Sequence, residues 1–356
     1  MVKPNLNRSD PIAYFIQDME YHGRSKRTQD AYFRVLTDFQ LFLNNECGTK
    51  INNATHRDCM AWLHGIRKIS SPSTIATYAS YVNRFYRYMS NVGILNSNPM
   101  LLVVEELTES IESNPIRRDI SLKSMQKFLK NISHPLDRAI IVTLLKTGMR
   151  VGELCNLDLR DLNLVDQDVT FTYKIKPRGA IGDRSKTLYI SKEPTRGEIY
   201  NGEVRTASNK RKRDTIVPID NELYHTLKVW LSIRPDSNSP AEPVFLSTSK
   251  WGHRITPSIV RSRLLEYTKT TGWHSPGAGA EENVTPHYFR HFFTTNLRNE
   301  TGDRGIVKYL RGDVADDVIE TYTHNWGNSV RTVYEKNIYK FNKIRAFDLR
   351  RCCSKS

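Results

Sequence analysis

The sequence predicts a mostly α-helical protein of two domains, with a small β-sheet in an α+β second domain. Apolar residues recur at helical spacing through the first hundred residues. An acidic stretch that ends in proline follows, and strand-like runs at 169–173 and 215–219 then interrupt helical sequence. A chain of 356 residues is also long for one domain, so we expect two.

Residues 1–100 are predicted to form a compact helical bundle. Thr28 can cap a long helix, Thr55 and Asp58 have the spacing of a capping box, and Ser73 can cap a further helix. Positively charged side chains recur on the polar faces, where they suit one side of a clamp around a polyanion: Arg24, Lys26, Arg27, Arg34, Arg67, Lys68, Arg84 and Arg87.

Residues 101–117 are predicted to form a linker, because the sign of the charge changes there and proline breaks regular structure. The second domain is expected to span 118–345, with a polar tail at 346–356. Ser121 can cap its first helix, and Gly148 stands just past the end of the next, where helices favour glycine.

The strand-like segments are Val169–Tyr173 and Thr215–Ile219. Between them, Leu188–Ile190 and Glu198–Tyr200 predict an additional hairpin. Apolar residues at helical spacing in 330–341 predict a C-terminal helix, which either docks on a neighbouring subunit or packs on its own domain.

The composition favours a nucleic-acid partner. A net charge of +15 and a pI near 9.5 suit a polyanion. The five cysteines form neither a disulfide framework nor a structural zinc pattern: Cys47, Cys59, Cys155, Cys352 and Cys353. The sequence also shows no P-loop and no carboxylate cluster, so no metal or other cofactor is expected. No signal segment or membrane span is recognisable, which predicts a cytoplasmic protein that acts on DNA.

Four residues are candidates for phosphate chemistry. Arg150 follows a helix stop, and its planar guanidinium group suits phosphate, with Glu153 placed to orient it. His287 and Arg290 lie three residues apart at the start of a helix, so both can face one ligand. Tyr322 can act as a nucleophile where cations stabilise its phenolate.

These motifs together resemble those of the tyrosine recombinases, the phage integrase and Xer family. The segment Thr147–Leu154 is similar to the family's first arginine motif, and Pro286–His291 is similar to its His-x-x-Arg motif. Tyr322 lies nine residues after Asp313, the spacing that the family shows between its Leu-Gly-His motif and its nucleophile. The resemblance covers nearly the whole chain and implies a SAM-like core-binding domain followed by a recombinase catalytic domain.

The resemblance also assigns a hairpin lysine, eight residues before the proline of a Val-Pro strand. Counting back from Pro218 gives Lys210, with Lys212 and Lys186 as alternatives. The chain departs from the family where Leu-Gly-His is usual, because it has Arg311-Gly312-Asp313 there. A carboxylate can accept a hydrogen bond and orient a neighbour, but it cannot donate to phosphate as an imidazolium does.

The resemblance implies that Tyr322 attacks a DNA phosphodiester and forms a 3′-phosphotyrosyl link. Arg150 and Arg290 would stabilise the charge on the phosphate, Lys210 would protonate the leaving 5′-oxygen, and His287 would move a proton at the nucleophile. The partners implied are double-stranded DNA with specific recombination sites and further copies of the chain, as a tetramer on paired sites.

Three functions are compatible with these residues. The favoured function is that of a site-specific recombinase. The Arg- and Gly-rich insertion slightly favours integration or excision of a virus or mobile element. A type IB topoisomerase-like enzyme would use a similar nucleophile to relax supercoils. A catalytically silent relative that only binds DNA is the third, and the acidic residue at 313 is the reason to consider it.

Overall fold

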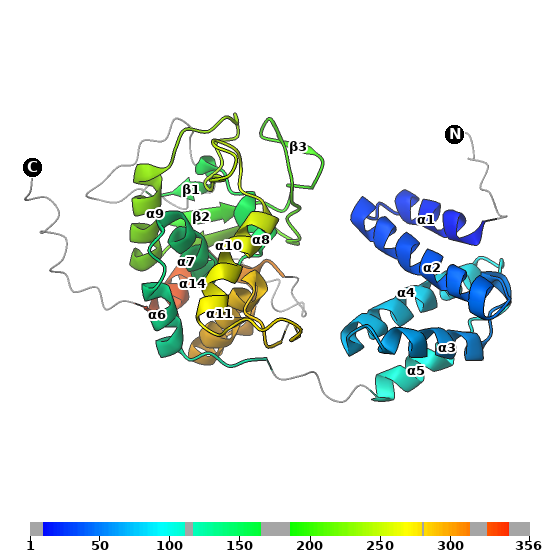
Figure 1. The fold of residues 1–356 in the computed structure, drawn as a ribbon. Coiled ribbons are helices and arrows are strands. Elements are labelled where there is room, and N and C mark those ends of the chain that lie inside the picture. Colours follow the sequence, from blue (N-terminus) through cyan, green and yellow to red (C-terminus); the bar gives the residue numbers. More distant parts are fainter. Residues whose placement is uncertain (1–9, 111–116, 165–185, 280, 314–325, 342–356) are drawn as a thin grey trace, which may run out of the picture. The chain divides into compact units, whose positions relative to one another are not determined.

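The computed structural model describes residues 10–110, 117–164, 186–279, 281–313 and 326–341. The chain divides into two compact units, Met1–Pro115 and Ile116–Ser356 (Figure 1). Each unit has its own hydrophobic core. Within the described ranges, no helix is both long enough and apolar enough to cross a membrane.

The N-terminal unit is a helical bundle, as the sequence predicts. Its helices are α1 (Pro11–Tyr21), α2 (Lys26–Glu46), the short 3₁₀ helix η1 (Ile51–Asn53), α3 (His56–Arg67), α4 (Pro72–Asn91) and α5 (Leu101–Ser110). Aromatic side chains fill much of the interior, and five of them are at most 4% exposed: Phe15, Phe39, Trp62, Phe85 and Tyr86.

The helices of this unit begin at capping residues, but two of these caps differ from the predicted ones. The predicted capping box is confirmed: the Thr55 N–H donates to Asp58 Oδ2 at 2.8 Å, and the Asp58 N–H donates to Thr55 Oγ1 at 3.4 Å. Ser25 and Ser71 cap α2 and α4 in place of the predicted Thr28 and Ser73. Both helices therefore begin about one turn or less before the predicted caps, because a serine already stands there.

The predicted linker 101–117 begins with a helix. Residues Leu101–Ser110 form α5, and Val103 is fully buried in the core of the N-terminal unit beside Met100. The acidic residues of this stretch favoured a linker in the sequence analysis, but Met100 and Val103 pack on the bundle, while Leu101 and Leu102 are exposed.

The C-terminal unit combines helices with two small antiparallel sheets. Its helices are α6 (Leu122–Lys130), α7 (Pro135–Thr147), α8 (Val151–Cys155), the 3₁₀ helix η2 (Leu159–Asp161), α9 (Asn221–Ile233), α10 (Pro257–Thr270), α11 (Pro286–Thr301), α12 (Arg304–Arg311) and α14 (Trp326–Asn337). Its strands are β1 (Leu162–Asn163), β2 (Thr187–Ile190), β3 (Ile199–Tyr200), β4 (Glu203–Val204) and β5 (Thr215–Pro218). Fold class and helix-rich character agree with the sequence prediction.

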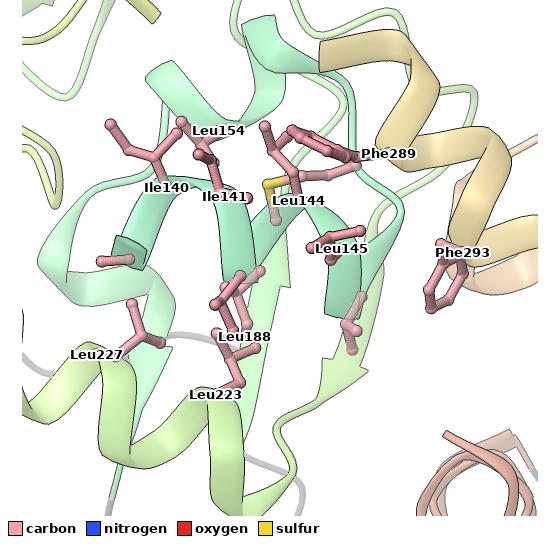
Figure 2. Close-up of a cluster of buried hydrophobic side chains, with 14 of the residues drawn as sticks. Ile140, Ile141, Leu144, Leu145, Leu154, Leu188, Leu223, Leu227, Phe289 and Phe293 are labelled. Carbon is pink, nitrogen blue, oxygen red and sulfur yellow. The ribbon is translucent and has the colours of Figure 1, made fainter. Parts of the chain in front are cut away.

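Helix α7 forms the centre of this unit. It packs against both α9 and α11. Figure 2 shows its apolar side chains surrounded by residues of α8, β2, α9 and α11, and all of those labelled are buried: Ile140, Ile141, Leu144, Leu145, Leu154, Leu188, Leu223, Leu227, Phe289 and Phe293. The predicted helix that ends at Gly148 is confirmed.

Strand pairing differs from the prediction in one respect. The larger sheet has the order β1-β2-β5, with Leu188 opposite Val217. Residues 188–190 therefore pair with β5, and 199–200 pair with β4 instead of forming a hairpin with β2. The predicted strand Val169–Tyr173 lies outside the described residues.

A buried ion-pair network anchors the insertion between β2 and β5. Arg205 donates to both carboxylate oxygens of Asp158, at 3.1 and 2.7 Å. Arg254 bridges Asp158 and Glu203, with both contacts at 2.6 Å. Because paired and hydrogen-bonded charges tolerate burial, this network fixes the β3–β4 hairpin to the segment after α8.

The chain after α14 packs on its own unit. The ammonium group of Lys146 is fully buried in α7 and lies 2.7 Å from Asp220 and 2.8 Å from Glu222. The same group donates to the Tyr339 carbonyl at 2.5 Å, and Phe341 is also buried. Of the two alternatives for the C-terminal helix, the structure shows packing within one chain.

Candidate active site

Arg150 lies at the N-terminal end of α8, where the backbone turns out of α7. Gly148 ends α7 in the left-handed conformation, with φ of 61°. A Cβ atom at that position would lie 2.3 Å from Cδ1 of Phe293, so glycine is required by both backbone and packing. The turn places Arg150 immediately before α8, with 29% of its side chain exposed.

The predicted pairing of Arg150 with Glu153 is confirmed. Glu153 is completely buried and accepts a hydrogen bond from the Arg150 backbone N–H at 2.9 Å. Its other oxygen accepts from the Arg150 guanidinium at 3.2 Å. Glu153 therefore caps α8 and orients the arginine with one carboxylate.

Arg290 approaches the same place from α11. Its guanidinium is buried (the residue is 2% exposed) and donates to the carbonyls of Gly148, at 2.8 Å, and Arg311, at 3.1 Å. Burial lowers the pKa of Arg290 to about 9, Arg150 lowers it as well, and Asp313 opposes the shift. The carboxylate thus favours the charged form of this buried arginine.

Asp313 joins the two arginines. Its Oδ1 accepts from Arg150 at 3.2 Å and from Arg290 at 2.9 Å, and its Oδ2 forms an ion pair with Nε of Arg311 at 2.9 Å. The sequence interpretation limited this residue to accepting hydrogen bonds and orienting neighbours. The structure shows it accepting from Arg150 and Arg290 together.

Arg211 is a member of the cluster that the sequence interpretation missed. It is 4% exposed and donates to Glu153 at 3.1 Å and to the Leu310 carbonyl at 3.1 Å. A Cβ atom at Gly312 would lie 2.3 Å from its Cγ, so the glycine leaves room for this arginine. Arg211 lies before β5, which begins at Thr215, and it is buried through contacts with α8 and α12 that the sequence alone does not show.

The three lysine candidates lie in different surroundings. Lys210 is exposed and directly precedes the buried Arg211, while the Lys212 backbone N–H donates to the Gly312 carbonyl at 3.0 Å. Lys186 donates to Asn221 at 3.1 Å, and its ammonium lies 4.2 Å from the centre of the Tyr224 ring. Lys210 and Lys212 therefore adjoin the arginine cluster, and Lys186 contacts α9.

His287 lies one turn before Arg290 on α11, and the ring of His291 is close to it, with centroids 5.0 Å apart. Partial desolvation and nearby arginines, Arg117 first, lower the pKa of His287, which favours the neutral ring. Burial lowers the pKa of His291 to about 4.

We expect the stability of the C-terminal unit to depend on His291 in mild acid. Its folded pKa of about 4 lies below the ordinary 6.5, so the unfolded chain binds more protons between these values. The stabilisation is complete above pH 6.5 and is lost as pH falls toward 4. The thermal midpoint should fall less between about pH 7 and about pH 5 in His291→Gln than in the wild type. Equal pH dependence of the two proteins would contradict this.

Tyr322, with Thr321–His324 around it, lies outside the described residues, which stop at Asp313 and resume at Trp326. The structure therefore brings Arg150, Arg290 and Asp313 into direct contact, with His287 on the same helix as Arg290. Lys210 adjoins them through Arg211.

The cluster is an anion site by charge. Among the residues that the structure describes, four guanidinium groups (Arg150, Arg211, Arg290 and Arg311) pair with two carboxylates, Glu153 and Asp313, so this described part of the cluster has a net charge of +2. Arginine pairs bind phosphate through parallel hydrogen bonds and need no metal ion to do so. A strongly basic, two-unit helical protein with such a site has the features of enzymes that act on the DNA backbone.

Comparison with known proteins agrees with an enzyme that acts on the DNA backbone. Residues 12–93 match the family model of the phage integrase N-terminal SAM-like domain, and residues 195–328 match that of the phage integrase family. The chain belongs to the tyrosine recombinase, or phage integrase, family, whose catalytic domain cleaves and rejoins DNA strands. It is thus a tyrosine-type site-specific recombinase that acts on DNA.

Relatives of known function cover most of the chain. It is 26% identical to the tyrosine recombinase XerC of Pelotomaculum thermopropionicum over 329 residues, 88% of this chain and 92% of that protein. It is 24% identical to the tyrosine recombinase XerD of Lacticaseibacillus casei over 335 residues, 91% and 97% of the two chains.

Solved structures share the fold. The Tn1549 transposon integrase in complex with transposon right end DNA superimposes with a TM-score of 0.64 at 17% identity, covering 92% of this chain and 98% of that one. A lambda integrase tetramer bound to a Holliday junction gives 0.61 at 15% identity, covering 89% and 83%.

Proposed function

We propose that the chain recombines DNA through a 3′-phosphotyrosyl intermediate with Tyr322 as nucleophile, and that it integrates or excises a virus or mobile element. The observation that carries the chemistry is the convergence of Arg150 and Arg290 on one oxygen of Asp313, at 3.2 and 2.9 Å. Two guanidinium groups that meet on one carboxylate oxygen can also grip the two non-bridging oxygens of one phosphate.

In the first step, the Tyr322 oxygen attacks phosphorus while the bond from phosphorus to the 5′-oxygen breaks. His287 takes the phenol proton, which a neutral imidazole can accept. Lys210 gives a proton to the departing 5′-oxygen. Arg150 and Arg290 stabilise the charge that builds on the phosphate, and such positioning supplies most of the catalysis in phosphoryl transfer.

The second step reverses the first with a different strand. A 5′-hydroxyl attacks the phosphotyrosine, the strand is rejoined and Tyr322 is released. One phosphoester replaces another in each step, so the bond energy is conserved and neither ATP nor another cofactor is consumed.

The partners proposed are duplex DNA and further copies of the chain, as a tetramer on paired sites. The lambda integrase tetramer bound to a Holliday junction supports this assembly, because this chain shares its fold. The integration role is supported by the structural likeness to the Tn1549 transposon integrase, while the XerC and XerD relatives share more of the sequence.

A duplex nicked near the cleavage point tests the chemistry, because the short strand released by cleavage diffuses away and traps the adduct. The binding site is first selected from random sequences by affinity for the protein. The wild type should form an adduct that resists SDS and leaves a free 5′-hydroxyl, whereas Tyr322→Phe should bind equally and form none. If the wild type forms no adduct on a site that it binds, the chain only binds DNA.

A second assay separates recombination from supercoil relaxation. A plasmid that carries two selected sites should yield products with exchanged flanks, while a plasmid without the site keeps its supercoils. Relaxation of both plasmids without exchange would favour a type IB topoisomerase-like activity.

A further inference from the structure

Two departures from the family pattern lie on either side of one glycine, Gly312. Where the family usually has Leu-Gly-His, this chain has Arg311-Gly312-Asp313. The position that lacks an imidazole thus holds a carboxylate, and a positive charge stands two residues earlier in place of leucine. The cation is displaced along the chain but stays within the same turn.

The turn at Gly312 places the guanidinium group of Arg311 next to Arg150 and Arg290. Gly312 ends α12 in the left-handed conformation, with φ of 68°, and reverses the chain direction. Asp313 then reaches Nε of Arg311 at 2.9 Å, while its other oxygen accepts from Arg150 and Arg290. The guanidinium groups of Arg150, Arg290 and Arg311 consequently surround the carboxylate of Asp313.

Arg311 is better placed than Arg290 to meet a ligand from solvent. Its side chain is 31% exposed, compared with 2% for Arg290 and 29% for Arg150. Among the residues that the structure describes, nothing accepts a hydrogen bond from its two terminal nitrogens, whereas Arg290 uses both of its own. Its backbone carbonyl is held by Arg290, which fixes where the side chain starts.

Arg311 also adds positive charge to the site. Asp313 cancels one of the two charges that Arg150 and Arg290 would offer a phosphate. With Arg311 present, three arginines share that carboxylate, and within the described part of the chain two positive charges remain for an anion whose negative charge grows in the transition state.

We propose that Arg311 is a third phosphate-binding arginine, which contacts a non-bridging oxygen in place of the missing imidazole, and that Asp313 is the positioning residue that holds it. The inference rests on the proposed strand-cleavage function. The proposal assigns a role to both Arg311 and Asp313. Asp313 without Arg311 would cancel positive charge at the site, and Arg311 without Asp313 would lack the carboxylate that positions it.

The test measures the rate of adduct formation on the nicked duplex for four proteins: wild type, Arg311→Leu, Arg311→Leu with Asp313→His, and the control Arg304→Leu. Arg304 is exposed at the opposite end of α12. We expect Arg311→Leu to slow adduct formation about a hundredfold. The double variant restores the Leu-Gly-His sequence and should recover much of that loss, and the control should react as the wild type does.

A second substrate separates phosphate contact from a structural role. Replacing one non-bridging oxygen of the cleaved phosphate by methyl removes its charge, so a missing arginine should matter less. The gap between the wild type and Arg311→Leu should narrow strongly on this neutral substrate. A defect of the same size on both substrates would mean that Arg311 only supports the fold, and would overturn the proposal.

Two further results would also overturn it. Arg311→Leu that reacts at the wild-type rate would remove Arg311 from the site, and a double variant no faster than Arg311→Leu would remove the coupling to residue 313. These outcomes leave the proposed function intact as long as the wild type forms its adduct and Tyr322→Phe does not. Failure of the wild type itself would reject that function instead.

Discussion

Replacing Arg290 with glutamine should slow adduct formation by at least about a hundredfold, the typical cost of removing one preorganised donor from a developing oxyanion. The buried guanidinium donates to two carbonyls and to Asp313, and glutamine supplies neither the charge nor the three donors. The rate is measured at saturating protein on the nicked duplex, so that weaker binding does not contribute.

The matched control is Arg298→Gln, an exposed arginine farther along the same helix. It should react as the wild type does. Arg150→Gln should resemble Arg290→Gln, and the double variant should lose less than the product of the two single losses, because both arginines share one oxygen of Asp313. Wild-type rates in either single variant would exclude that arginine from the phosphate site.

Replacing Lys146 with methionine should lower the free energy of unfolding of the C-terminal unit by about 3–5 kcal/mol. The substitution leaves Asp220 and Glu222, which are 9% and 7% exposed, without their shared cation. The Tyr339 carbonyl also loses its donor. Urea unfolding of the full chain, followed by the fluorescence of the tryptophans, measures the change.

Two companion variants give this measurement its meaning. Lys336→Met removes an exposed lysine from α14 and should change stability by no more than about 0.5 kcal/mol. Adding Asp220→Asn and Glu222→Gln to Lys146→Met removes the stranded charges and should recover part of the loss. A Lys146→Met protein as stable as the wild type would show that the buried cluster does not hold the C-terminal segment.

Local signals predicted the helices of both units well. The capping residue Ser121 located the start of α6 and Gly148 located the end of α7, because these features act within one or two turns of the chain. The same local view missed the β3–β4 hairpin, although Asn201-Gly202 is the typical two-residue turn sequence and both residues have positive φ, 53° and 80°.

The sequence predicted which residues form the site, but it did not predict the contacts between them. Arg150, Arg290 and Asp313 come from the start of α8, from α11 and from the residue after α12, so only the tertiary fold shows that they meet. The burial of Arg211 likewise depends on its contacts with Glu153 of α8 and Leu310 of α12. Sequence indicated an acceptor at 313, and the structure identifies the groups that donate to it.

Tyr322 is the residue that we expect to become linked to DNA, and the proposed function depends most directly on it. Trypsin cleaves after Arg311 and Arg331, and the peptide 312–331 contains Tyr322 as its only tyrosine. After adduct formation, nuclease trimming of the DNA and mass spectrometry of the tryptic digest, the account predicts that this peptide carries the nucleotide mass, with fragmentation placing it on Tyr322. A nucleotide linked to any other residue, such as Tyr309 or Tyr334 on the neighbouring peptides, would contradict it.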